Sequence, residues 1–428
     1  MHEIVTLHIG QCGNQIGNEF WKKMCTEHKI STEGRLLTDQ EDRKDVLFYQ
    51  ADDFSFIPRA ILIDLEPRVI NNCLSLFNKE NIFISNEGGG AGNNWAHGYY
   101  VANKCKADVL DIVQREVEAC DSLETFMLMH SVAGGTGSGF GSLMLENLRD
   151  NYPKKLITSF SILPTNEEGS DVVVQPYNTV LSLNYLNQFS DNIIAMDNNA
   201  LSKVTLDSAR IKNVSFGQLN SLVSTVLSSY SSTIRFPGHM YCDNRSILSC
   251  SVPFPEYKFL VPSFTPFTCD ELYQVVRATT VGDVMRRLTM PKTKLCSYDY
   301  SATNVSLAVF NILEGVRSPS EISRFTESIF SKKSINFVNG IPKFYLSAVS
   351  LKEPMFNRVS GLSLNNTSGI SSLFKKIGSQ FDQLKKRNAF VEMYKKFDTD
   401  LLLFDSSREA LQRVIENYEN CENGFIAE

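Results

Sequence analysis

Residues 125–150 read TFMLMHSVAGGTGSGFGSLMLENLRD, and this stretch decides the fold that we expect. The apolar run at 125–130 predicts a buried strand, and residues 141–150 follow a helical pattern. The glycine-rich turn between them, at 133–139, lets the backbone approach a phosphate without a Cβ clash. N–H groups of the turn and of the helix N-terminus add positive potential there. The stretch therefore indicates a phosphate-binding turn, although a tight turn alone has the same composition.

Strands and helical patterns alternate from the N-terminus to about residue 200. The strand-like runs lie at 4–9, 60–65, 125–130, 156–163 and 192–196. Helical patterns such as those at 141–150 and 176–188 separate them. Recurring strand–helix–strand units predict a mostly parallel, doubly wound sheet, in which ligands bind at the carboxyl ends of the strands.

The middle of the chain has a different pattern. Apolar residues at helical spacing predict a helix at 216–235, packed on several sides by small residues. Prolines punctuate the region from 236 to 360, which also carries strand-like runs at 305–313 and 343–351. This region is therefore expected to form a second, mixed α/β domain.

The last part of the chain is expected to be helical. An apolar stripe at 370–384 predicts one helix, and Ser406 with Glu409 fits a capping box that opens a final one. Residues 370–396 include seven basic and two acidic side chains. A solvated helix face is the favoured explanation of this basic stretch, and a partner-binding patch is the alternative.

Composition excludes several classes of protein. The chain has 428 residues, of which 43% are hydrophobic and 21% charged, so it can bury a sizeable core and is not disordered, collagenous or coiled-coil overall. Its 42 basic and 48 acidic residues give a net charge of −6, which provides no overall field for nucleic acid. An anionic ligand would have to be held by local groups.

Cysteine spacing and hydropathy suggest a cellular setting. The ten cysteines form no CxxC pair and no Cys/His spacing, which favours reduced, buried thiols over a disulfide or zinc framework and points to the cytosol or nucleus. The N-terminus lacks the pattern of a signal peptide. The uncharged windows at 125–145 and 213–234 contain five glycines and seven serines respectively, so neither predicts a membrane span.

Two further glycine loops strengthen the case for phosphate binding. One contains Gly10, Gln11, Cys12 and Gly13 after the first strand, and the other, at 88–94, follows a short strand near 82–84. Three such loops at one sheet edge are hard to explain as turns alone. None of them is a Walker A loop or has the spacing of the dinucleotide fingerprint.

Carboxylates occur at the same expected edge. The strand at 60–65 ends in Asp64-Leu65-Glu66-Pro67, and Pro67 suits the first turn of a following helix. Carboxylates beside phosphates suggest a hydrated Mg²⁺ site. The alternative, acidic residues that favour the helix dipole, is more serious for Asp64 than for Glu66. No histidine lies in a nucleophile or zinc pattern, so a hydrolase triad is unsupported.

These motifs together resemble the tubulin family over essentially the whole length of the chain. The motifs are GQCGNQIG at 10–17, DLEPRVI at 64–70, GAGNNWA at 90–96, GGTGSG at 134–139, VVVQPYN at 172–178 and RFPG at 235–238. Within the family the chain is most similar to the gamma-tubulins. That similarity is carried by DRKDVLFYQADD at 42–53, Gln175, TTVGDVMRRL at 279–288, SGISSLF at 368–374 and the lack of a polyglutamate tail.

The resemblance implies an α/β architecture with four parts. A Rossmann-like GTP-binding domain with a parallel sheet would span 1–215, and a central core helix 216–235. An intermediate mixed α/β domain would follow at 236–365, and a C-terminal helical layer at 366–428. The implied cofactors are GTP or GDP and Mg²⁺.

The resemblance also assigns roles to matching residues. On the phosphate and metal side it places Gln11, Cys12, Asp64, Glu66, Ala91, Gly92, Asn93, Gly134, Gly135, Thr136 and Gly137, with Mg²⁺ near Asp64 and Glu66 and the γ-phosphate near residues 91–93. Ser131, Asp171 and Gln175 would lie near the ribose and phosphates. Asn198 and Asn220 would read the guanine edge, and Phe216 would stack on the base.

Two departures from other tubulins bear on activity. Gln175 replaces a Glu of the alpha and beta chains, so its charge is gone. After RFPG, the positions at which alpha-tubulin presents an Asp and a Glu to a neighbour's nucleotide hold Asp243 and Ser246. The second carboxylate that could activate a water is missing, which implies a poor activator of a neighbour's GTP hydrolysis.

The expected function is therefore that of a GTP-binding microtubule nucleator with at most slow GTP hydrolysis. Its expected partners are alpha/beta-tubulin on the nucleotide face, gamma-tubulin complex proteins on the opposite face and further copies of itself in a ring, with no nucleic acid and no membrane. The expected location is a cytoplasmic microtubule-organising centre, such as a centrosome or spindle pole body. A lattice-forming tubulin or filament GTPase is the alternative, and a nicotinamide dehydrogenase is disfavoured because its fingerprint is absent.

Overall fold

The protein is seen here as a computed structural model, which divides into two compact units. The structure describes residues 2–71, 73, 75–85, 89–164, 172–209, 215–267, 280–301, 303–332, 334–353 and 358–424. Unit 1 contains Met1–Gln40, Lys44–Ile193 and Phe374–Ile415, and unit 2 contains Glu41–Arg43, Ile194–Leu373 and Glu416–Glu428. The units follow contacts rather than chain order, so the four expected domain segments stay a prediction.

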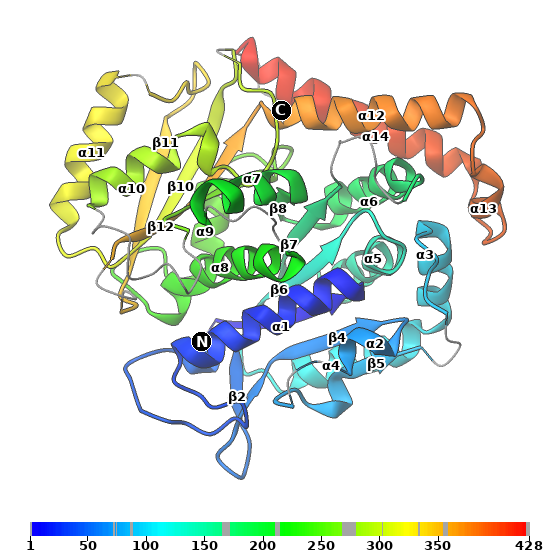
Figure 1. Cartoon of the computed structure of the whole chain (residues 1–428), viewed down its shortest axis with the longest axis horizontal. Helices are drawn as coiled ribbons and strands as arrows, with labels where there is room; N and C mark the ends of the chain where they lie inside the picture. Colours follow the sequence, from blue (N-terminus) through cyan, green and yellow to red (C-terminus); the bar gives the residue numbers. More distant parts are fainter. Residues whose placement is uncertain are drawn as a thin grey trace. The chain divides into compact units, whose positions relative to one another are not determined.

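Unit 1 is built on a parallel sheet. Its strands lie in the order β7–β6–β1–β4–β5 (Figure 1). Their bounds are Glu3–Ile9 for β1, Ala60–Asp64 for β4, Ile82–Ile84 for β5, Leu123–Ser131 for β6 and Leu156–Leu163 for β7. Leu7 pairs with Ile61 on one side and with Leu128 on the other. Because β1, β4 and nearly all of β6 are buried along their length, the sheet is covered on both faces, as parallel sheets are. The expected α/β fold class is confirmed.

Helices alternate with these strands. They are α1 (Gly10–Glu27), α2 (Pro67–Ile70), α3 (Trp95–Lys104), α4 (Lys106–Glu118), the π-helical turn η3 (Thr136–Phe140), α5 (Gly141–Asn151) and α6 (Gln175–Phe189). Short 3₁₀ turns lie at η1 (Lys44–Val46) and η2 (Lys79–Asn81), and the strands β2 (Phe48–Gln50) and β3 (Phe56–Pro58) form a small antiparallel pair. Pro67 opens α2 as its sequence position predicts.

The C-terminal helices are α12 (Ile370–Lys386), α13 (Val391–Lys395) and α14 (Leu401–Glu422). Within unit 1, α12 and α14 are joined by Arg408 Nη2 and Asp382 Oδ2 at 3.0 Å, and by Lys385 and Asp405. Figure 1 shows α13 beside α3, which it contacts. Some of the basic side chains at 370–396 therefore pair with acids, among them Lys385 with Asp405 and Lys395 with Glu392.

The start of the final helix differs from its prediction. The helix begins at Leu401, so the Ser406 and Glu409 pair lies inside it rather than at its N-cap. Ser406 Oγ donates to the Leu403 carbonyl at 3.1 Å, and Asp400 Oδ1 accepts from Leu402 N at 3.0 Å near the true start. A Ser-x-x-Glu pattern has the same spacing inside a helix as at its end, which explains the error.

Unit 2 contains a mixed sheet in the order β11–β10–β12–β9. The strands are β9 (Phe259–Thr265), β10 (Ser306–Glu314), β11 (Phe344–Ser350) and β12 (Ser360–Thr367), and only the β10–β11 pair is parallel among those described. The remaining elements are β8 (Asn192–Asp197, at the boundary of the units), α7 (Asn198–Ala209), α8 (Phe216–Arg235), α9 (Asn244–Ser251), α10 (Val281–Leu288), the turn η5 (Pro291–Thr293) and α11 (Pro319–Lys332).

Both faces of this mixed sheet are covered. Val309 and Leu313 join a hydrophobic core with residues of α10 and α11. Figure 1 shows these two helices beside the sheet. Phe310 points to the opposite face, where its ring packs against that of Tyr241, which precedes α9. The centroids of the two rings are 5.4 Å apart. The sequence predicted β10 and β11 but not α9, α10 or α11.

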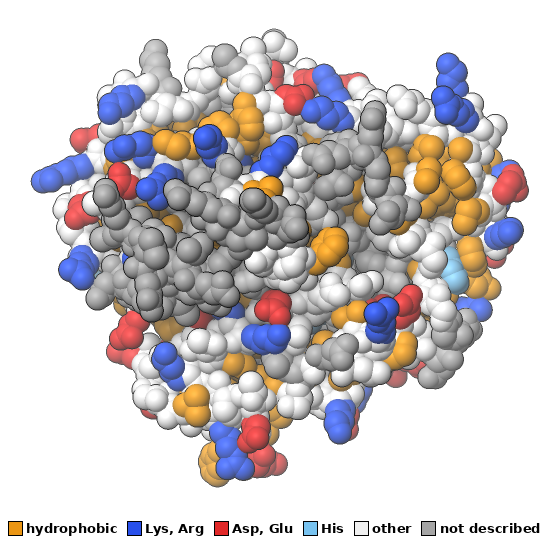
Figure 2. Space-filling model, viewed as in Figure 1, with side chains coloured by type: hydrophobic (Ala, Val, Ile, Leu, Met, Phe, Trp, Pro, Cys, Tyr) orange, Lys and Arg blue, Asp and Glu red, His pale blue; other side chains and the backbone are white. Residues whose placement is uncertain are grey.

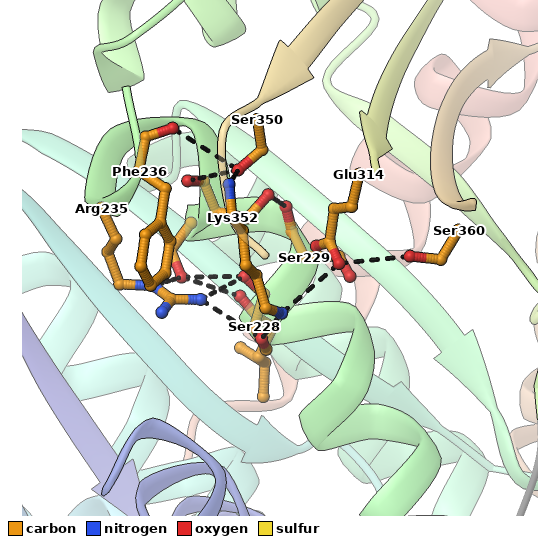
Figure 3. A network of polar contacts seen from close by, with 11 residues as sticks. Ser228, Ser229, Arg235, Phe236, Glu314, Ser350, Lys352 and Ser360 are labelled. Atoms are coloured by element: carbon orange, nitrogen blue, oxygen red, sulfur yellow. Dashed lines mark hydrogen bonds and ion pairs between the residues drawn. The ribbon is translucent and has the colours of Figure 1, made fainter. Parts of the chain in front are cut away.

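The helix α8 occupies the residues predicted for it and ends in a buried polar network (Figure 3). The guanidinium of Arg235 is fully buried, and it donates to Ser231 Oγ at 3.0 Å and to the Ser228 carbonyl at 2.8 Å. Nearby, Lys352 Nζ lies 3.4 Å from Glu314 Oε2. Hydrogen bonds to helix carbonyls and a paired carboxylate compensate the cost of burying these charges.

The surface carries charges of both signs. On the face shown in Figure 2, Lys and Arg side chains are interspersed with Asp and Glu rather than gathered into one field. None of the helices that the structure describes is long and apolar enough to cross a membrane. The cysteines in the described part of the chain are free thiols, and Cys269 lies outside it.

The buried Lys352–Glu314 pair gives a stability prediction. Lys352→Met leaves the Glu314 carboxylate buried without its cation, so we expect the free energy of unfolding to fall by about 3 kcal/mol. Lys352→Met combined with Glu314→Gln removes both charges and should recover most of that loss. Urea unfolding of the three proteins measures it, and a double variant as unstable as the single one would contradict the charge argument.

Candidate functional site

The turn after β1 and the turn after β6 touch through their glycines. Gly10 has a φ of +72°, and a Cβ built on it would lie 2.9 Å from Gly137 N. A Cβ on Gly137 would lie 2.6 Å from the Ser131 carbonyl oxygen. Real Cβ atoms do not approach other atoms this closely, so these turns meet only because side chains are absent. Two of the three predicted glycine loops therefore lie together at the carboxyl ends of β1 and β6.

The third glycine loop joins the same cluster. A Cβ on Gly135 would lie 2.6 Å from Ala91 Cβ, and one on Gly90 would lie 2.1 Å from Glu66 Oε1. By contrast, a Cβ on Gly92 would meet no atom within 4 Å, and one on Gly134 would only reach the Asn93 side chain at 4.0 Å. The cluster is thus closed among its own loops but open above Gly92 and Gly134, as a backbone cradle for a phosphate would be.

The two predicted carboxylates occupy different environments. Asp64 is buried at the end of β4, where its Oδ1 accepts from Leu65 N at 2.8 Å and its Oδ2 has no partner among the described residues. Burial raises the pKa of Asp64 to about 6, and the charge of Glu66 adds to that rise. Glu66 is exposed and lines a pocket of about 350 Å³ that Gln11 and Asn14 also line.

The residues present fit a hydrated cation rather than a closed metal cage. Among the described residues no group of three or more His, Cys, Asp or Glu side chains could hold a metal ion. Two buried oxygens, Asp64 Oδ2 and Asn14 Oδ1, have no partner in the part of the chain that the structure describes, and both need donors. Waters around a Mg²⁺ bound to phosphates would supply such donors.

Other residues predicted on the phosphate side lie around this cluster. Gln11 and Cys12 are in the first turn of α1, and burial raises the pKa of the Cys12 thiol to about 12, which favours the protonated thiol near pH 7. Ser131 ends β6, where its Oγ accepts from Ala133 N at 3.3 Å. Gln175 is the first residue of α6. Asp171 lies outside the described residues.

The residues predicted to contact the base belong to unit 2. Asn198 is the first residue of α7, and Phe216 and Asn220 lie one turn apart on α8, which α7 contacts. The Phe216 ring is 74% exposed, as a stacking surface requires. Asp197 fixes the start of α7, because its Oδ1 accepts from Ala200 N at 2.7 Å and from Ser297 Oγ at 3.1 Å.

Asn14, His130 and Asn178 lie behind the loops and were not predicted. Asn14 Nδ2 donates to the carbonyls of Gly10 and Ile63, both at 3.0 Å, and so ties the ends of β1 and β4. Asn178 contacts the two other loops. Asn14 and His130 are buried polar residues beside glycine turns in the sequence, so a search for such residues could have found them, whereas Asn178 has no glycine turn beside it.

His130 supports the phosphate-loop turn from beneath. Its Nδ1 lies 2.9 Å from the Gly137 carbonyl, which can only accept, so Nδ1 carries the proton and Nε2 accepts from Ser161 Oγ at 2.8 Å. Burial lowers the pKa of His130 to about 4, and the bond to Gly137 partly opposes that. The ring is therefore neutral near pH 7 and serves as a fixed donor.

The start of α9 carries residues 243 and 246, the two positions that the resemblance compares with a pair of acids in alpha-tubulin. Asp243 is the N-cap of α9, and its carboxylate accepts from Ser246 N at 3.2 Å and from the Ser246 hydroxyl. The Ser246 hydroxyl thus donates to the Asp243 carboxylate, and position 246 contributes no carboxylate of its own. Only one carboxylate is available in this turn.

Comparison with known families agrees with the fold and with the loop cluster. The model of the Tubulin/FtsZ family GTPase domain matches residues 3–205, and that of the tubulin C-terminal domain matches residues 255–379. The two ranges together cover about three quarters of the chain. The chain belongs to the tubulin family of cytoskeletal proteins, as the resemblance predicted, and its GTPase domain implies that it binds GTP or GDP.

The neutral His130 ring gives a pH prediction. At a pH below about 6.5 histidine is protonated in the unfolded chain, whereas the folded His130 ring, with its lowered pKa, stays neutral. The unfolded state then binds more protons than the folded state, so stability is lost as the pH falls. From about pH 7 to about pH 5 this group should lower the free energy of unfolding by about 2 kcal/mol.

His130→Asn keeps an N–H near the position of Nδ1 but cannot titrate, so its unfolding free energy should depend less on pH over this range. Chemical denaturation across the pH series measures the difference. His239→Asn, at an exposed position, is the matched control. Equal pH slopes for wild type and His130→Asn would show that His130 does not cause the loss.

Proposed function

We propose that this chain is a gamma-type tubulin, which binds GTP and nucleates microtubules instead of forming their wall. The observation that carries the proposal is the start of α9, where Ser246 donates its hydroxyl to Asp243 and supplies no second carboxylate. A subunit in a microtubule wall that triggers its neighbour's GTP hydrolysis needs such a group to activate water. The gamma-type motifs at 42–53, 279–288 and 368–374 support the same assignment.

The nucleotide side of the proposal rests on the glycine cluster. Gly134 and Gly92 leave their backbone open, so the loops after β6 and β5 would hold the phosphates, with Gln11 and Cys12 at the first turn of α1. Asp64 and Glu66 would hold Mg²⁺ through its waters, and the ion would neutralise phosphate charge. Asn198, Asn220 and Phe216 would select and stack on guanine.

A low rate of GTP turnover follows from the same residues. Burial raises the pKa of the Cys12 thiol to about 12, and His130 is a neutral donor to the backbone, so neither side chain would activate a water molecule. The nucleotide would therefore act mainly as a bound structural group. Alpha/beta-tubulin would add to the nucleotide face, and gamma-tubulin complex proteins would hold further copies in a ring at a microtubule-organising centre.

Assembly kinetics test the proposed role. Held in a ring complex, the protein should shorten the lag of alpha/beta-tubulin polymerisation, followed by light scattering, because a template removes the slow nucleus. Alone, it should form no long polymers. If the purified chain assembled by itself into microtubules or filaments with GTP turnover, it would be a lattice-forming tubulin or filament GTPase instead.

The metal site gives a second test. Asp64→Asn together with Glu66→Gln should lower the Mg²⁺-dependent part of GTP affinity by at least about tenfold, or about 1.4 kcal/mol, because both anionic oxygens facing the ion are lost. Equilibrium titration with and without EDTA measures it. Glu118→Gln, an exposed acid on α4, is the control. Unchanged Mg²⁺ dependence would assign both carboxylates a structural role only.

A further inference from the structure

Asn178 is a fully buried side chain in the first turns of α6, and it contacts both open glycine loops. Its Nδ2 donates to the Asn93 carbonyl at 2.8 Å and to the Ala133 carbonyl at 2.9 Å. These two residues belong to the loops after β5 and β6. One amide nitrogen therefore sets the spacing between the two loops that the proposed function assigns to the phosphates.

The amide oxygen of Asn178 is also fully used. It accepts from Trp95 N, at the start of α3, at 2.9 Å and from the Tyr394 hydroxyl at 2.7 Å. An Asn side chain has two donors and one oxygen with two lone pairs, so all its bonding capacity is satisfied. A buried amide held in four directions has one orientation, and each bonded group is fixed relative to the others.

Tyr394 lies on α13, so the same bond reaches the C-terminal helices of unit 1. Its ring is buried against Tyr177 and Phe404, with centroid distances of 5.6 and 5.3 Å. A second bond runs in parallel, because Asn94 Nδ2 donates to the Met393 carbonyl at 3.0 Å. The loop at residues 89–94 is thus tied to α13 directly by the Asn94 bond and indirectly, through Asn178, by the bond to the Tyr394 hydroxyl.

We propose that Asn178 is a positioning residue for the nucleotide phosphates and that its bond to Tyr394 couples the 89–94 loop to α13. The inference rests on the proposed function for the identity of its ligand, a guanine nucleotide with Mg²⁺. Since Asn93 lies on the side expected for the γ-phosphate, the coupling distinguishes GTP from GDP. Coupling between two binding sites is reciprocal. If exchanging GDP for GTP changes the affinity of a partner for α13 by some factor, binding of that partner changes the preference for GTP over GDP by the same factor.

The test uses three variants of the full chain. Asn178→Asp keeps the acceptor toward Trp95 and Tyr394 but loses both donors, so the loop spacing is no longer fixed. Tyr394→Phe removes only the hydroxyl that links α13. Tyr177→Phe is the matched control, because it removes a buried hydroxyl from the same ring cluster that has no partner among the described residues.

Two readouts apply to each protein. Equilibrium titration with GTP and with GDP gives the ratio of the two dissociation constants, which a general loss of stability does not change. Hydrogen exchange of residues 391–395 with each nucleotide reports whether α13 responds to the γ-phosphate. Thermal unfolding identifies any variant that fails to fold.

We expect Asn178→Asp to weaken GTP binding at least tenfold and GDP binding less, and Tyr394→Phe to weaken GTP binding two- to fivefold. Both should reduce the difference in α13 exchange between nucleotides, because only the Asn94–Met393 bond then links the loop to α13, and Tyr177→Phe should match wild type. If Asn178→Asp does not fold, Tyr394→Phe decides. A folded Tyr394→Phe protein with wild-type GTP preference and α13 exchange would overturn the coupling, whereas a wild type that retains no guanine nucleotide would overturn the proposed function.

Discussion

The loop cluster depends on one constraint: the backbones of its glycine loops lie closer together than they could if those residues carried side chains. Gly10 lies against Gly137, and Gly135 lies against Ala91, with no room for a Cβ atom on either Gly10 or Gly135. Each contact fixes the end of one strand against the end of another. A Cβ at any of these glycines would lie closer to the neighbouring loop than atoms ordinarily approach, so the loops would have to move apart. The candidate site is therefore a property of the whole edge of the sheet.

Buried polar groups then give this edge its orientation. Asn14 ties β1 to β4, His130 holds the turn after β6, and Asn178 spans the loops after β5 and β6. All three act as donors to carbonyl oxygens, and none needs a charge to do so. Because a buried carbonyl without a donor is costly, these amides and this imidazole specify one arrangement of the loops.

The sequence predicts the fold better than it predicts the site's supports. Apolar runs and glycine turns are local, so β7 and α8 were placed at their true residues and the parallel sheet followed. The roles of Asn178 and His130 depend on partners far away in the chain, and no local pattern reveals such pairs. The false cap at Ser406 has the same origin, since the spacing of a motif does not say whether a helix has already begun.

The composition of unit 1 has a consequence for how the protein is made. Asn178 and Tyr394 are 216 residues apart, and the Tyr177 ring packs against Phe381 and Phe404. A ribosome releases the first strands and helices long before these partners exist. The growing chain must therefore hold a parallel sheet with an uncovered helix until nearly all of it has been synthesised, and such long-range closure is slow and open to aggregation. Truncation near residue 380 would leave a nascent chain that cannot finish its first folding unit.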